Sequence, residues 1–139
     1  MNDFHRSLPM MMYRTLDAVM PAFRHIFSRF GLTEQQWRVL RVLWENDAQP
    51  LLSLSRATLI SSPSLVGIVD RLTRDGLVER VRSQTDRRVV NVCVTKRGRA
   101  LEHKVTPLIS KTYEDLENRL DADEWRDLYR MLDELAGDS

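Results

Sequence analysis

The chain of 139 residues has a single cysteine and no apolar run long enough to cross a membrane. One cysteine cannot form a disulfide within the chain, and a membrane-spanning helix needs about twenty consecutive apolar residues. The N-terminal segment also lacks the ordered basic stretch, apolar stretch and small-residue cleavage site of a secretory signal. These absences predict a cytoplasmic protein with no membrane partner. The length of the chain predicts one domain, residues 1–139.

Signatures of catalysis and metal binding are also absent. His5, His25 and His103 have no ligand spacing among themselves or with a cysteine cluster. No nucleophile–base motif and no phosphate-binding loop is present. The sequence therefore predicts no enzyme, no metal and no cofactor. We interpret Cys93, on the outer face of an expected strand, as a half-buried small residue and not a redox sensor.

The net charge of +1 is unevenly divided along the chain. Residues 71–99 carry nine Lys/Arg and three Asp/Glu, a net of +6, whereas residues 100–139 carry five and eleven, a net of −6. A local basic excess favours a polyanionic partner. The alternative is two solvated surfaces, and charge alone does not decide between them.

Helical periodicity dominates most of the chain. Apolar residues at helical spacing predict a helix over about 10–30, in which Pro21 is expected to cause a kink or break. A capping box of Thr33 and Gln36 opens a second helix. Residues 51–76 indicate a short helix, a turn and a second helix that begins with Ser62 as N-cap and Pro63 as first helical residue. Two more helices follow Thr95 and a second capping box at residues 121–124.

Between these helices, the stretch SQTDRRVVNVCVTKRG alternates apolar and polar residues. Val90, Val92 and Val94 fall on one face, which predicts a strand that all three valines anchor to the core. Residues 77–83 supply the other strand of a hairpin with a charged turn. The predicted fold class is thus mainly α with a small β-hairpin, an α+β winged helix-turn-helix. Residues 32–99 form its DNA-binding module, and residues 1–31 and 100–139 form dimerisation helices.

In such a fold the second helix of the motif enters the major groove while the wing tip reaches beside the duplex. The expected DNA-binding residues are Ser62, Ser64, Leu65, Gly67, Arg71, Arg74, Asp86, Arg87 and Arg88. Gly67 fits either a close approach of DNA or a packing contact. Arg71 and Arg74 could equally be solvated, and Asp86 is expected to accept a bond from an arginine or a turn amide and so to hold the tip in shape.

The residues Arg82, Asp86, Arg87, Arg88, Thr95 and Gly98, preceded by VDRLTRDGLVER, resemble the signature of the MarR family. The resemblance implies a homodimer that binds a pseudo-palindromic operator on double-stranded DNA, usually as a repressor that a small ligand releases. LTEQQWRVLRVL and PSLVGIVDRLTRDGLV are similar to the subgroup of repressors of homoprotocatechuate catabolism. Two departures are Val94 in place of the usual leucine and LSLSRATLI without the common acidic residue and glycine turn.

Apolar stripes on the terminal helices predict the dimer interface, with the candidates Leu16, Phe23, Trp125, Leu128, Leu132 and Leu135. The subgroup resemblance implies an aromatic carboxylate as effector, which needs an apolar slot and a cation. The candidates for this site are Met10, Met11, Arg14, Arg24, Trp37 and Arg38. Each also has an ordinary interpretation as core, ion pair or solvated surface. The alternative function is a ligand-independent architectural DNA-binding protein or a protein-interaction winged helix.

Overall fold

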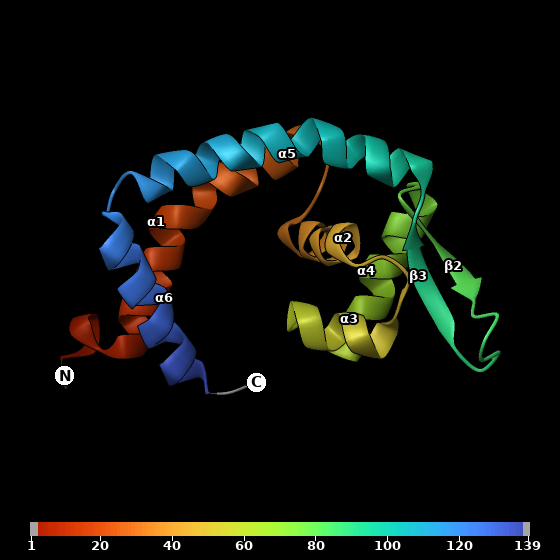
Figure 1. Cartoon of the computed structure of the whole chain (residues 1–139), viewed down its shortest axis with the longest axis horizontal. Helices are drawn as coiled ribbons and strands as arrows, with labels where there is room; N and C mark the ends of the chain where they lie inside the picture. The colour runs from red at the N-terminus through yellow and green to blue at the C-terminus, as the bar shows by residue number, and fades with distance from the viewer. Residues whose placement is uncertain (1–2, 138–139) are drawn as a thin grey trace.

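The computed structural model describes residues 3–137, and Figure 1 shows them as two parts that long helices join. The elements in chain order are η1 (Phe4–Arg6), α1 (Leu8–Arg29), α2 (Glu34–Glu45), β1 (Gln49–Pro50), α3 (Leu51–Thr58), α4 (Ser62–Arg74), β2 (Val78–Arg82), β3 (Val90–Val94), α5 (Lys96–Glu117) and α6 (Ala122–Ala136). No single helix among these residues is long and apolar enough to cross a membrane.

One part, which we call the head, comprises residues 32–99 with α2, α3, α4 and the sheet (Figure 1). The other, the arm, comprises the N-terminal half of α1, the C-terminal half of α5 and all of α6. Helix α5 runs from the sheet to the far end of the arm, where α6 folds back beside α1. The hydrophobic core lies mainly in the head, and α1 and α5 contribute to it, for example with Phe27 and Val105.

The sheet has three antiparallel strands in the order β1-β3-β2. The predicted hairpin is confirmed, and its strands pair Val78 with Val94 and Arg82 with Val90. The short strand β1 was not predicted, because its two residues carry no periodicity. Of the three valines expected to anchor the hairpin, Val92 is buried and Val94 packs against the core. Val90 is exposed, because it lies at the tip end of the strand, beyond the reach of the core.

Two local predictions differ from the structure at least in part. Of the kink or break expected at Pro21, the break does not occur, since helix α1 continues through this residue. Pro21 is exposed, so the backbone bond that it removes faces solvent. The N-cap of α4 is Ser61, one residue before the expected Ser62. Both capping boxes are confirmed, since Thr33 exchanges bonds with Gln36 and Asp121 exchanges bonds with Glu124.

Candidate nucleic-acid interface and adjoining cavities

Helix α4 has one buried and one exposed face. Leu65, Ile68, Val69 and Leu72 form the buried face. Leu65 was expected among the DNA-binding residues, but its side chain is 0% exposed, so it belongs to the core and cannot reach a duplex. The exposed face carries Ser62, Ser64, Gly67, Arg71 and Arg74. Helical geometry places the core leucines and the exposed residues on opposite sides of the same turns.

The exposed face of α4 is unobstructed and cationic. A Cβ atom added to Gly67 would meet no atom within 4 Å, so no packing contact within the chain explains this glycine. Asp70, the acidic residue of this face, is paired with Arg80 of β2 at 2.7 Å. Among residues 3–137, neither Arg71 nor Arg74 takes part in an ion pair. Two free guanidinium groups therefore flank an open helix backbone, which suits a phosphate or a base edge.

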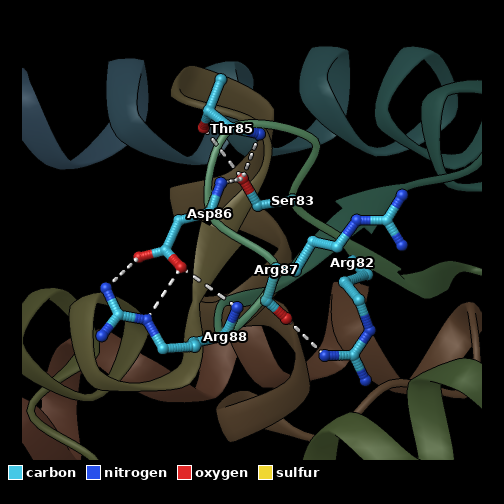
Figure 2. Close-up of polar contacts among 6 residues, drawn as sticks. All are labelled: Arg82, Ser83, Thr85, Asp86, Arg87 and Arg88. Atoms are coloured by element: carbon cyan, nitrogen blue, oxygen red, sulfur yellow. Dashed lines mark hydrogen bonds and ion pairs between the residues drawn. The ribbon is translucent and has the colours of Figure 1, made fainter.

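The wing tip is held by a small set of hydrogen bonds (Figure 2). Ser83 Oγ accepts the backbone amides of Thr85 at 3.3 Å and Asp86 at 3.2 Å. Asp86 Oδ1 accepts both the amide and Nε of Arg88 at 3.1 Å, and Oδ2 accepts Nη2 at 3.3 Å. Asp86 is therefore a structural residue of the tip that accepts bonds from an arginine and from a turn amide, as expected from the sequence.

This arrangement treats the two adjacent arginines differently. Arg88 is committed to Asp86, although its side chain is 91% exposed. Arg87 contributes its carbonyl oxygen to Arg82 Nη1, and its own guanidinium makes none of the contacts drawn in Figure 2. Arg87 has no ion-pair partner among residues 3–137, so within that part of the chain its guanidinium is free at the tip. The side chain and the amide of Arg88 hold the pKa of Asp86 below its ordinary value, so the carboxylate stays charged.

The turn between α3 and α4 forms without the glycine that is common at this place in the family. Leu59 takes the left-handed conformation there, with φ of 59°, and its side chain is 86% exposed. Side chains hold the turn: Thr58 Oγ1 accepts the amide of Ile60 at 3.3 Å, and Ser55 Oγ donates to the Ile60 carbonyl at 2.6 Å. Arg38, expected near a ligand, instead donates to the carbonyl of Thr58.

Among the described residues, three cavities adjoin Trp37, and the smallest, of about 190 Å³, also has Arg38 and Arg41 in its lining. Of the other two, the larger, which we call the arm groove, has a volume of about 700 Å³ and lies between α1, α5 and α6. Its lining includes Met11, Arg14, Leu16, Phe23, Trp37, Tyr113, Trp125, Leu128 and Leu132. Three of the expected ligand residues, Met11, Arg14 and Trp37, therefore share one groove. Met10 and Arg24 do not line it, and Arg24 pairs with Glu34 at 3.4 Å.

The smaller of these two cavities, which we call the tryptophan cavity, has a volume of about 370 Å³. It is lined by Trp37, Arg41, Trp44, Glu45, Glu102, Val105, Thr106, Ile109, Ser110 and Tyr113. Among the described residues, the buried indole nitrogens of Trp37 and Trp44 have no hydrogen-bond partner. Its two carboxylates are both paired, Glu45 with Arg41 at 2.8 Å and Glu102 with Arg99 at 3.1 Å. The cavity thus combines aromatic walls and a cation, and two of its lining residues have indole nitrogens without a partner.

Sequence reasoning missed Arg41 and Tyr113 as members of this site. Arg41 lies four residues after Trp37, so both occupy the same face of α2, and this spacing was available in the sequence. Tyr113 comes from near the C-terminal end of α5, 76 residues away along the chain. The packing of α5 against α1 and α2 brings Tyr113 to the cavity, and no local sequence pattern predicts this.

The predicted interface residues divide between the surface and the core. Leu16 and Leu135 are exposed, at 53% and 63%, and Trp125, Leu128 and Leu132 are half-buried along the arm groove. No residue of α6 is buried. Phe23 differs, because it is only 5% exposed and packs against Tyr113 with 5.0 Å between ring centroids. Phe23 is therefore a core residue of the single chain.

The structure also shows the surroundings of Cys93 and of the candidate metal-ligating side chains. Burial and the nearby carboxylates Asp47 and Glu79 raise the pKa of the Cys93 thiol, which keeps it protonated and unreactive. This agrees with its interpretation as a half-buried small residue. Across residues 3–137, no group of three or more His, Cys, Asp or Glu side chains is arranged to hold a metal ion.

Comparison with known proteins relates this architecture to transcriptional regulators. The model of the MarR family matches residues 32–90, from the start of α2 to the wing. The homoprotocatechuate degradative operon repressor of Escherichia coli is 36% identical over 130 residues, which cover 94% of this chain and 88% of the repressor. The transcriptional regulator FarR of Neisseria gonorrhoeae is 33% identical over 132 residues, or 95% and 90% of the two chains.

Solved structures agree over the full length. NadR in complex with 4-hydroxyphenylacetate matches with a TM-score of 0.83 at 31% identity, covering 100% of this chain and 99% of NadR. The repressor CouR, bound to a 23-mer DNA duplex, matches with a TM-score of 0.86 at 29% identity, covering 99% and 97%. With its winged helix-turn-helix head and helical arm, the chain belongs to the MarR family of DNA-binding transcriptional regulators.

Proposed function

We propose that this chain is a repressor that binds a pseudo-palindromic operator as a homodimer and is released by an aromatic carboxylate. In this proposal residues 32–99 are the DNA-binding module, and residues 1–31 and 100–139 are the dimerisation helices. The observation that carries it is the combination of a cationic recognition surface on the head with a cavity between α2 and α5 that has aromatic walls and a cation. The first reads DNA, and the second responds to a metabolite.

The DNA-binding part of the proposal rests on free charge. Arg71 and Arg74 on α4, and Arg87 at the wing tip, are the guanidinium groups that these two elements present without an ion-pair partner in the described chain. Ser62 and Ser64 lie in the first turn of α4, where backbone amides favour a phosphate. Ser64 also accepts the hydroxyl of Ser61 at 2.9 Å. Arg88 and Asp86 shape the tip and contribute to DNA contact indirectly.

The homodimer is supported by the arm. A helix with no buried residue and with exposed Tyr129, Met131 and Leu135 has too little covering in one chain. An isologous contact with a second arm would fill the arm groove and cover Leu16, Trp125, Leu128 and Leu132. Two heads held by one dimer would then meet two half-sites about one helical turn apart.

The effector is proposed to occupy the tryptophan cavity. Its volume falls within the range of small-molecule sites, about 300–1,000 Å³. Arg41 is the cation for a carboxylate, since its pair with Glu45 is exposed and is readily exchanged. The indole N–H groups of Trp37 and Trp44 and the hydroxyl of Tyr113 are candidate partners for further oxygens. Relatives named for homoprotocatechuate and for 4-hydroxyphenylacetate support a phenolic acid and control of aromatic-acid catabolism.

The experiment has two stages. The wild-type protein selects a duplex from a random library, and footprinting shows whether an inverted repeat is protected. Uniform weak binding would instead favour the architectural alternative. The selected duplex is then titrated with protein in the presence and absence of 4-hydroxyphenylacetate, with neutral 4-hydroxyphenylacetamide as the control for the carboxylate.

Variants decide which cavity binds the effector. Arg41→Ala should abolish binding of 4-hydroxyphenylacetate in calorimetry, because it removes the proposed cation. Arg24→Ala is the matched control, since Arg24 is an exposed arginine that also pairs with a glutamate of α2, Glu34, and lines neither cavity. Arg14→Ala tests the arm groove. Binding that survives Arg41→Ala and is lost in Arg14→Ala would move the effector to the arm groove, and no binding by the wild type would remove the aromatic effector.

A further inference from the structure

Arg99, in the first turn of α5, is shared between the tryptophan cavity and the base of the wing. Its Nη1 donates to the carbonyl of Trp44 at 3.2 Å and to Glu102 Oε1 at 3.1 Å. Its Nη2 lies 3.9 Å from Asp47 Oδ2. Trp44 and Glu102 line the cavity, whereas Asp47 does not. One guanidinium thus joins the cavity wall to a residue outside it.

Asp47 is in turn bonded to the wing. Its Oδ1 accepts the amide of Val94 at 2.8 Å, across 47 residues of sequence, and the amide of Ala48 at 2.8 Å. Val94 is the last residue of β3 and pairs with Val78 at the start of β2, so it marks the base of the hairpin. Ala48 has a φ of 59°, a conformation that costs free energy and that the bond from Asp47 supports. Asp47 therefore connects the end of α2 to the base of the wing.

We propose that Asp47 and Arg99 are positioning residues that transmit occupancy of the tryptophan cavity to the wing. The inference rests on the proposed function, because it takes the effector to bind in that cavity. An anion arriving at Arg41 adds negative charge beside Glu102 and draws Arg99 toward the cavity. The contact with Asp47 yields, since it is the longest of the three that Arg99 makes. Asp47 then holds Val94 less firmly, and the hairpin turns Arg87 away from the duplex.

Because the contact between Arg99 and Asp47 is exposed, variants of these residues can test coupling without a large loss of stability. The side chains of Arg99 and Asp47 are 40% and 38% exposed, and ion pairs so exposed contribute little to stability. Asp47→Asn keeps an oxygen to accept the amide of Val94 but removes the charge that faces Arg99. Arg99→Met keeps an unbranched side chain but removes the guanidinium. Lys111→Ala is the matched control, because it deletes an exposed cation of α5 whose partner is Asp115.

The test measures coupling for each protein as the ratio of operator dissociation constants with and without saturating 4-hydroxyphenylacetate. Allosteric coupling of the usual size gives a ratio of about 5 to 150 for the wild type and for Lys111→Ala. In Asp47→Asn and Arg99→Met we expect the ratio to fall close to one, while calorimetry still shows 4-hydroxyphenylacetate bound. Hydrogen exchange of the Val94 amide should quicken on ligand binding in the wild type and not respond in either variant.

The outcomes separate this inference from the proposed function. A ratio unchanged from the wild type in both variants would overturn the inference while leaving the proposed function standing. Loss of ligand binding in Arg99→Met, with full coupling in Asp47→Asn, would make Arg99 a ligand contact and would also overturn it. If the wild type itself fails to bind 4-hydroxyphenylacetate, or binds it without losing operator affinity, the proposed function fails and the inference fails with it.

Discussion

The head and the arm differ in what covers their apolar side chains. In the head, Leu40, Leu43, Leu54, Leu65 and Leu72 are fully buried by neighbouring elements of the same chain. In the arm, α6 has a clear apolar stripe but no buried residue. The head therefore carries its own core, whereas the arm exposes the surface that a second chain can cover.

This difference separates two kinds of mutational effect. A change in the buried face of the head should act on the stability of one chain, whatever the protein concentration. A change in the arm should act on association and therefore depend on concentration. Substitutions at the exposed face of α4 and at the wing should leave both properties nearly unchanged and alter operator binding. The following experiments test these distinctions, from the largest expected effect to the smallest.

The largest effect is expected at Leu65, because its side chain is fully buried in α4. Leu65→Ala should lower the free energy of unfolding by about 2–5 kcal/mol, through lost burial and the cavity left behind. Val66→Ala is the control, since Val66 is the next residue and is 44% exposed. Denaturant unfolding measures both. Normal stability with weakened operator binding in Leu65→Ala would mean that this leucine contacts DNA after all.

A smaller but still large effect is expected in the arm. Leu132→Asp places a charge in the half-buried stripe of α6 and should weaken dimerisation by about 2–4 kcal/mol, as loss of an interface hot spot does. Arg126→Ala, on the same helix but paired only with Asp123 at the surface, should have little effect. Sedimentation equilibrium gives the dissociation constants. A wild-type monomer, or an unchanged dimer in Leu132→Asp, would contradict the proposed interface.

The sequence predicted the local structure of both parts well, because that structure depends on signals between near neighbours. Capping boxes, the helical stripes and the alternation of β3 each need only a few consecutive residues. Errors arose where packing decides. The helix does not break at Pro21 because the bond that proline removes faces solvent, and Phe23 is covered by Tyr113, 90 residues away.

The candidate sites show the same limit. Free charge on α4 and the bonds of the wing tip could be anticipated, since they depend on spacing within one helix or one turn. The tryptophan cavity was only half anticipated. Trp37 could be identified from the sequence, but Tyr113 and Glu102, which also line the cavity, come from α5. Arg38, which was expected at the site, instead donates to the carbonyl of Thr58. Tertiary contacts between distant segments decide such sites, and one sequence does not encode them as a local pattern.

At the wing, the two adjacent arginines should differ in importance. Arg87→Ala should weaken operator binding by about 1–3 kcal/mol, because its guanidinium is free for DNA. Arg88→Ala should have a smaller effect, since that guanidinium already pairs with Asp86. Binding isotherms at several salt concentrations measure both, and a lost phosphate contact lowers the salt slope by about 0.9 per contact, doubled in a symmetric dimer. Equal losses in the two variants would refute the distinction.

Gly67 should show two effects of opposite sign. Gly67→Ala should stabilise the head by about 0.8–1.0 kcal/mol, because alanine favours a helix interior and nothing lies within 4 Å of the new methyl group. The same methyl group should weaken operator binding if the backbone approaches DNA closely. Thermal unfolding and operator titration on one protein preparation measure the two effects. Improved stability with unchanged operator affinity would show that DNA does not come close at this position.

The smallest effect is expected from the carboxylate of the wing tip, where charge and conformation are linked. Asp86 has a pKa below its ordinary value of 3.8, chiefly because of the Arg88 side chain and then the Arg88 amide. A lowered folded-state pKa means that the ordering contribution is complete above the unfolded pKa and is lost as pH falls through the folded one. The tip should therefore stay ordered from pH 8 down to about pH 4 and loosen only below it.

Asp86→Asn should loosen the tip at every pH, with a smaller loss of operator affinity than Arg87→Ala. Titration of the Asp86 carboxyl shift by NMR, with the Arg88 amide as reporter, tests this. A midpoint at or above the ordinary value would show that Arg88 does not hold the carboxylate, and Arg88 would then be a second free cation beside Arg87.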